Sequence, residues 1–299
     1  MNILSLFVVI PALMLLGLWA ARNLNQVRGV MVTGASCLLA LSIWLTIYFI
    51  QQRAGGNTDE MLLVASMPWF KPLNIAYSVG VDGISVVMLL LSSIIVFTGT
   101  FASWQLKPLT KEYFLWFTLL STGVFGFFIC TDMFTMFMFY EVALIPMYLL
   151  IGVWGSGHKE YSAMKLTLML MGGSALLILG LLGIYFFNGQ YSGTYTFELT
   201  TIAAAHAIPG WIQNIFFPFI FIGFGVLGAL ARAEQVHGYV PVGRQLSVQL
   251  TEVALRLWLQ HAVLPAYAAA VLILLSHSLF VSLCRYSVMP ICRYSDITG

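Results

Sequence analysis

The chain has 299 residues, of which 60% are hydrophobic and 8% are charged. Soluble domains carry roughly a quarter charged residues, so the composition excludes an ordinary soluble globular protein. The net charge of +2 gives too little basic density for a nucleic-acid partner. The four cysteines form no CxxC pair, so neither a disulfide framework nor a thiolate metal site is indicated.

Charge-free runs long enough to cross a bilayer fill most of the chain. A transmembrane helix needs about 20 consecutive apolar residues, and the period-2 alternation of a membrane barrel is absent. The sequence therefore predicts an all-α, polytopic transmembrane helix bundle. Its seven helices lie within residues 2–21, 29–52, 83–106, 113–131, 133–158, 166–197 and 199–231, the last centred on 211–230 after Pro209. The run 257–284 is a weaker eighth candidate because Pro265 interrupts it.

The remaining segments are too short and too scattered to form a second domain. The largest polar segments are 51–82, 188–207 and 232–256, and we interpret each as a surface loop. The predicted organisation is a single membrane domain over residues 1–230, followed by an atypical tail over 231–299.

Basic residues are distributed unevenly between the two sides of the predicted bundle. The loops after the first, third, fifth and seventh helices contain Arg22, Arg28, Lys107, Lys111, Lys159, Lys165, Arg232, Arg244 and Arg256. The opposite loops before the third helix contain only Arg53 and Lys71. By the positive-inside rule, the N-terminus is predicted to face away from the cytoplasm.

Glu141 is the single charged residue in the fifth predicted helix. At 1.5 Å per residue it lies about 12 Å from Met133, near the middle of the membrane. An ionised group there costs on the order of 3 kcal/mol, and such residues usually face a bundle interior or a water-filled path. We therefore interpret Glu141 as a group that takes up and releases protons. The alternative is a carboxylate held by a neighbouring hydroxyl without proton traffic.

Two further residues bear on this carboxylate. Pro146 removes one helix hydrogen bond and clashes with the Val142 carbonyl, so it predicts a kink one turn beyond Glu141. Lys165 is the natural counter-charge if the sixth helix begins near His158. A lysine that extends to the membrane interface is the competing interpretation of Lys165.

Other motifs carry weaker signals. Asp132, between the fourth and fifth helices, is predicted to be a helix N-cap rather than a guard at a channel mouth. The segment Gly223–Gly228 matches GxGxxG, but it lies in an apolar run without a preceding strand. We interpret these glycines, and Gly172, Gly173, Gly180 and Gly183, as sites of close helix packing. The histidines and carboxylates show no metal-binding spacing.

Three elements in order resemble a known family. The fifth-helix segment from Phe139 to Gly155, FYEVALIPMYLLIGVWG, is similar to that of the antiporter-like subunits of proton-pumping NADH-quinone oxidoreductase (respiratory complex I), closest to subunit M. The segment Val81-Asp82-Gly83-Ile84-Ser85 resembles the VDGxS element that opens the third helix of this family. Ala163-Met164-Lys165, followed by Gly172-Gly173-Ser174, resembles its sixth-helix segment. The resemblance covers residues 1 to about 230.

The resemblance implies a function as well as a fold. The chain would be the first part of an inverted-repeat bundle that translocates protons, with Glu141 as the channel carboxylate and Lys165 as the lysine that modulates it. It implies a bacterial inner membrane and other membrane subunits as partners. NADH, FMN, iron-sulfur clusters and quinone would belong to the assembled complex, and this chain would hold no redox site. A subunit of a cation/proton antiporter or membrane hydrogenase, and a non-transporting scaffold, are the alternatives.

The sequence departs from this family in two places. The family usually carries a lysine on its seventh helix, whereas the corresponding run 219–228 contains none, which leaves Lys165 as the best remaining partner. After Ala231 nothing resembles the expected continuation, and Cys284-Arg285-Tyr286-Ser287 recurs as Cys292-Arg293-Tyr294-Ser295. We expect the tail to be a frameshifted or foreign C-terminus, with a diverged short paralogue as the alternative.

Overall fold

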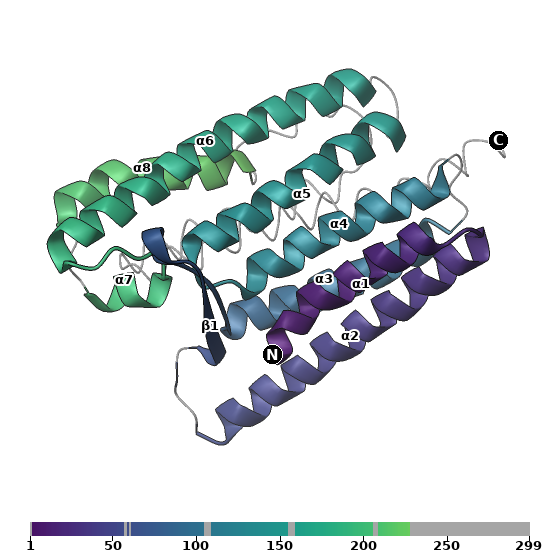
Figure 1. Ribbon diagram of the computed structural model, residues 1–299, viewed down its shortest axis with the longest axis horizontal. Helices are drawn as coiled ribbons and strands as arrows, with labels where there is room; N and C mark the ends of the chain where they lie inside the picture. The colour runs from purple at the N-terminus through teal and green to yellow at the C-terminus, as the bar shows by residue number, and fades with distance from the viewer. Residues whose placement is uncertain are drawn as a thin grey trace.

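The computed structural model describes residues 2–56, 59, 61–104, 109–154, 159–205 and 209–227. Figure 1 shows the elements in chain order. They are η1 (Ile3–Ser5), α1 (Leu6–Ala20), α2 (Leu24–Ala54), β1 (Leu62–Phe70), η2 (Lys71–Leu73), β2 (Ile75–Val81), α3 (Gly83–Ala102), α4 (Thr110–Ile129), α5 (Met133–Trp154), α6 (Lys159–Ser192), α7 (Leu199–Ala205) and α8 (Gly210–Leu227). The eighth candidate span, 257–284, and the tail 231–299 lie outside the described residues.

Six of the described helices are long and apolar enough to cross a membrane. They are η1 with α1, and α2 to α6, which fall on the first six predicted runs. The seventh predicted helix, centred on 211–230, corresponds to the shorter apolar α8, and the start of its run 199–231 forms the separate short α7. Pro209 lies between them, and a proline disfavours helical backbone at the preceding residue.

The long helices lie side by side around α4 (Figure 1). α4 contacts α1, α3 and α5, and it is the most buried of the candidate spans. Its inward side chains include Phe114, Phe117 and Phe125, all fully buried. The outer helices expose large apolar side chains instead, such as Trp19, Ile145 and Leu168. This outward apolar surface is what a hydrocarbon environment favours.

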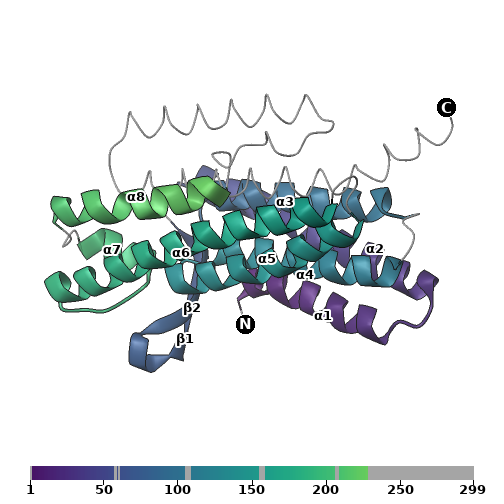
Figure 2. The same cartoon turned by 90° about the horizontal axis from the view of Figure 1, so that it is seen from above.

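A β-hairpin occupies part of the segment that the sequence analysis interpreted as a loop. β1 and β2 pair antiparallel, and Asn74 closes the turn between them in the left-handed conformation, with φ of 52°. β2 also bridges to Cys130, and Asp132 bridges to Glu198. The hairpin therefore lies at the end where α4 stops and α5 starts, and Figure 2 shows it projecting from the helical layer. The loop prediction for 51–82 was wrong over these strands.

Local sequence explains where α3 begins. The Asp82 carboxylate accepts the Ser85 backbone N–H at 2.7 Å, which caps a first turn that would otherwise have unpaired donors. The VDGxS element therefore opens the third spanning helix, as the sequence predicted.

The GxGxxG segment is part of a helix packing surface. An added Cβ at Gly223 would lie 2.9 Å from the Gly173 carbonyl oxygen on α6, so only glycine allows this approach. Gly180 and Gly183 meet Ile220 and Phe216 of α8 in the same way. The packing interpretation is confirmed at these three positions. It was wrong for Gly172, where an added Cβ would meet nothing within 4 Å.

Candidate functional site

Glu141 lies on α5, eight residues from the start of the helix. The rise of 1.5 Å per residue places it about 12 Å from Met133. Its side chain is half-buried, and the Oε1 atom is fully covered with no hydrogen-bond partner among the described residues. The sequence placed this carboxylate inside a spanning helix, and the structure agrees. An unsatisfied carboxylate oxygen in apolar surroundings is costly unless water or a proton compensates it.

The packing of α5 on α6 decides what faces Glu141. Gly152 of α5 lies against Ala163 of α6, where an added Cβ would be 3.7 Å from the Ala163 Cβ. The two helices are joined as a hairpin and run antiparallel. Glu141 lies eleven residues before Gly152 on α5, and Ser174 lies eleven residues after Ala163 on α6, so the two residues are level with each other. The Ser174 hydroxyl interacts with the Glu141 carboxyl group. Sequence reasoning did not assign Ser174 to the site, because the helix register was unknown.

Ser174 is suited to both protonation states of a carboxyl group. The side chain is buried, and its Oγ donates to the Met171 carbonyl at 3.1 Å. In this arrangement the Oγ lone pairs can accept a hydrogen bond from a protonated Glu141. Rotation of the hydroxyl hydrogen would instead direct it to the ionised carboxylate.

Tyr140 adds a second polar group beside Glu141. Its side chain is 7% exposed, and its hydroxyl is buried with no hydrogen-bond partner in the described part of the chain. A buried hydroxyl without a protein partner is a place where water can bind. Sequence reasoning did not assign Tyr140 to the site, because tyrosine is common in apolar helices.

Lys165 lies on α6 but away from Glu141. Its ammonium group is positioned over the Tyr161 ring, 5.7 Å from the ring centroid. Lys165 precedes Ser174 by nine residues, so it is about 13 Å further along the helix axis. The two charges therefore form no direct ion pair in this conformation. Lys165 does lie six residues into α6, close to where the sequence placed it.

Pro146 lies within α5 and Asp132 directly precedes the helix, on either side of the carboxylate. α5 continues through Pro146, which has no N–H to donate to the Val142 carbonyl. Asp132 is 1% exposed, and it accepts the Thr135 N–H at 2.9 Å, which confirms it as the N-cap of α5. Burial raises the pKa of the Asp132 carboxyl, and the Thr135 hydrogen bonds oppose this effect.

The neighbouring helix α8 supplies no charged partner. It packs against α6, and Gly210–Leu227 contains no acidic or basic residue. In the described part of the chain, no three His, Cys, Asp or Glu side chains gather in a way that could hold a metal ion. The arrangement around Glu141 is therefore one carboxylate, two hydroxyl groups and a distant lysine.

Comparison with known proteins gives the family. The family model described as NADH:quinone oxidoreductase/Mrp antiporter, transmembrane, matches residues 130–295. The chain belongs to this family. NADH-quinone oxidoreductase subunit M of Rickettsia conorii is 27% identical over 224 residues, which is 75% of this chain and 44% of the relative. The chain thus spans less than half the length of the curated relatives it matches, and the family match extends into the 231–299 tail.

Solved structures confirm the predicted bundle. Respiratory complex I from Thermus thermophilus with bound NADH superposes with a TM-score of 0.63 at 20% identity, over 75% of this chain and 44% of that chain. The Mrp complex from Dietzia sp. DQ12-45-1b gives a TM-score of 0.59 at 17% identity, over 76% of this chain and 23% of that chain. These similarities establish that the helices have the antiporter-like fold.

Proposed function

We propose that this chain is a proton-translocating membrane subunit of an NADH-quinone oxidoreductase, consistent with its membership of the family. The observation that carries the proposal is Glu141, a half-buried carboxylate with an unpartnered oxygen inside an otherwise charge-free span. A carboxylate of this kind is expensive to keep in a membrane, and its usual use is in an ion or proton path.

The residues around Glu141 suggest how it would exchange a proton. A proton arriving through water near the Tyr140 hydroxyl would neutralise the carboxylate, and Ser174 would accept a hydrogen bond from the acid. When the proton leaves, the Ser174 hydroxyl would rotate to stabilise the anion. Pro146 leaves the Val142 carbonyl without its helical donor, so it offers one more acceptor near the path. Lys165, about 13 Å away, would act through intermediate groups rather than by direct contact.

Redox chemistry is assigned to other subunits. We propose that the iron-sulfur clusters, FMN, NADH and quinone act in those subunits and not on this chain. The assembled complex would supply these groups, and the partners of this chain would be its other membrane subunits. Our proposal is that conformational or electrostatic coupling from those subunits changes the proton affinity of Glu141.

The distribution of basic residues supports an orientation in a bacterial inner membrane. Lys111 donates to the Trp19 and Ala21 carbonyls, and Arg28 donates to the Trp104 carbonyl. These contacts bring the ends of α1 and α3 and the starts of α2 and α4 to one end of the bundle. We propose that this basic end faces the cytoplasm and the N-terminus faces away from it.

The experiment is NADH-driven proton uptake in membrane vesicles that contain the assembled complex with Glu141→Gln. We expect most of the pumping to be lost, because glutamine cannot carry the proton. The matched control is Glu160→Gln, which removes an exposed carboxylate in the first turn of α6. Unchanged pumping in Glu141→Gln, with normal assembly, would contradict the proposal and favour a scaffold without transport.

The second candidate is a subunit of a multi-subunit cation/proton antiporter or membrane hydrogenase. The structural similarity to the Mrp complex favours keeping it, because the same fold serves there. Purification of the complex from its native membrane separates the two functions by the partner chains recovered. NADH-oxidising subunits would support the oxidoreductase, and their absence with antiporter or hydrogenase subunits present would support the alternative.

The nature of the tail bears on whether either function is retained. We propose that residues 231–299 are frameshifted, because the sequence directly after Ala231 lacks the expected continuation; the family match, which extends to residue 295, favours the alternative of a diverged tail. Resequencing codons 225 to 240 and translating the three frames tests this. Another frame that restores the family continuation would support the proposal, and three frames without it would make the tail genuine.

A further inference from the structure

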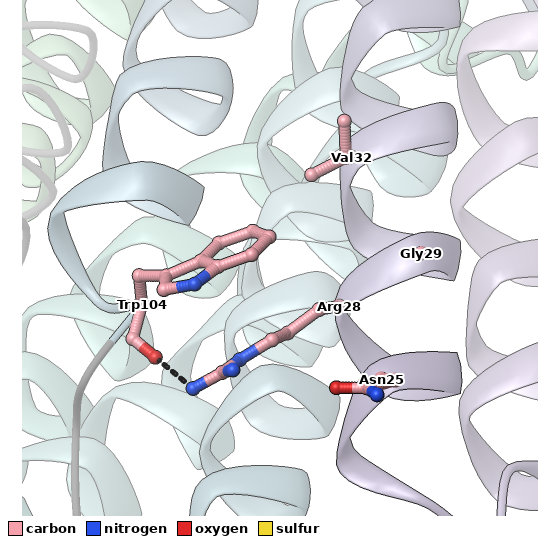
Figure 3. Close-up of a pocket in the computed structure, with 5 residues that line it drawn as sticks. All are labelled: Asn25, Arg28, Gly29, Val32 and Trp104. Atoms are coloured by element: carbon pink, nitrogen blue, oxygen red, sulfur yellow. Dashed lines mark hydrogen bonds between the residues drawn. The ribbon is translucent and has the colours of Figure 1, made fainter.

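A pocket of about 400 Å³ opens between the start of α2 and Trp104, two residues beyond the end of α3. Asn25, Arg28, Gly29, Val32 and Trp104 line it (Figure 3). The four α2 residues are spaced three or four positions apart, so they lie on one face of the helix. The pocket is far along the chain from Glu141, and the proton path above does not use it.

Among the described residues that line this pocket, Arg28 has no counter-charge. Its Nη2 donates to the Trp104 carbonyl at 2.7 Å, and the guanidinium lies 4.9 Å from the indole centroid. The Nε atom is buried and has no hydrogen-bond partner among the described residues. No acidic side chain lines the pocket. Because a guanidinium has five N–H donors in a planar fork, an oxyanion is the ligand that fits the remaining donors.

The pocket changes from polar to apolar along α2. Asn25 and Arg28 lie in its first turns, and Val32 lies one turn deeper. Gly29 leaves space between them, since an added Cβ would meet nothing within 4 Å. A tryptophan beside an arginine at the end of a spanning helix is typical of the membrane interface. A phosphate bound at Arg28 would thus have an apolar channel beneath it for an acyl chain.

We propose that this pocket binds the phosphate headgroup of an anionic phospholipid. The remaining N–H groups of the Arg28 guanidinium and the Asn25 amide would donate to the phosphate, while the acyl chain would lie over Gly29 and against Val32. Arg22 at the same end of α2 adds positive charge that attracts anionic lipid to the surface, but its side chain does not line the pocket. The proposal does not depend on whether the chain pumps protons.

Native mass spectrometry of the purified full chain can test this site. The chain would be equilibrated with an equimolar mixture of phosphatidylglycerol and phosphatidylcholine, and the retained lipids counted. We expect phosphatidylglycerol to be preferred, and Arg28→Gln to lower that preference about fivefold, the effect of one arginine contact with anionic lipid. Arg22→Gln is the matched control, because it removes the same charge outside the pocket, and we expect it to lower the preference much less than Arg28→Gln does.

Two more variants keep the test decisive if Arg28→Gln folds poorly. Arg28→Lys retains the charge and should retain most of the preference. Gly29→Leu fills the space without changing charge, and should lower retention of both lipids. Equal losses in Arg28→Gln and Arg22→Gln would overturn the proposal, because they would indicate attraction to the surface as a whole. Retention that is unaffected by Gly29→Leu, or a wild-type chain without a phosphatidylglycerol preference, would also overturn it.

Discussion

Gly123 of α4 lies close to the backbone of α5, the helix that carries Glu141. An added Cβ there would lie 2.8 Å from the Phe139 carbonyl oxygen, 2.8 Å from the Ala143 Cβ and 3.0 Å from the Ala143 nitrogen. Two of these atoms belong to the α5 backbone, so relief requires α5 to move. Overpacking of this kind costs roughly 1–3 kcal/mol, while alanine gains about 1 kcal/mol over glycine in a helix interior. We expect Gly123→Ala to lower the free energy of unfolding by up to about 2 kcal/mol.

The matched control is Gly172→Ala on α6, where an added Cβ meets nothing within 4 Å. That variant has the same propensity gain without the clash, so we expect it to be neutral or stabilising by up to about 1 kcal/mol. Unfolding midpoints in a sodium dodecyl sulfate titration, followed by circular dichroism, compare the two variants. If Gly123→Ala were as stable as Gly172→Ala, the close approach of α4 and α5 described here would be wrong.

Substitutions at three further positions test other parts of the structure. At pH 7, Asp132→Asn should be neutral or stabilising because it keeps the cap without a buried charge, and Asp132→Ala should cost about 1 kcal/mol. Burial raises the Asp132 pKa, so ionisation of Asp132 opposes folding. In thermal melts, the stability of Asp132→Asn relative to the unsubstituted chain should therefore increase as the pH rises from below the ordinary Asp range through the raised pKa. Tyr113→Phe leaves the buried Ser103 hydroxyl, 2.9 Å away, without its partner and should cost about 1 kcal/mol in the same melts. Asn74→Gly should be tolerated, whereas Asn74→Val should lower the melting temperature, because φ is 52° there; equal melting temperatures would contradict this reasoning.

The spanning helices could be predicted because the bilayer imposes a simple requirement. A run of about 20 residues without charge has few alternatives to a helix in lipid. The requirement for a long charge-free run does not apply to segments outside the membrane. The β1–β2 hairpin lies in such a segment and was not predicted. A signal was present in β2, where Ile75, Tyr77, Val79 and Val81 alternate with smaller or polar residues, as in a strand with one buried face. The bridges from β2 to Cys130 could not be predicted, because they join segments distant in sequence.

Glu141 could be identified as a candidate because an ionised carboxylate inside a membrane is energetically costly. The residues that surround it could not be predicted. Which residues face a membrane carboxylate depends on how far neighbouring helices slide along each other, and a single sequence contains no such measure. In this chain the contact between Gly152 and Ala163 sets that register. It puts Ser174, a residue with no evident chemical signal, opposite the carboxylate.

The same register explains why Lys165 is misleading in the sequence. Among the described helical residues that follow Glu141, Lys165 is the second basic one, after Lys159 at the start of α6. Because α5 and α6 run antiparallel, however, residues close to the connecting turn are level with the end of α5 and not with its middle. Lys165 is therefore level with Leu150, which is fully buried. Any influence of Lys165 on Glu141 must cross the two turns of α6 that lie between it and Ser174, so the proposed pair is a coupled arrangement with hydroxyl groups or water between its members.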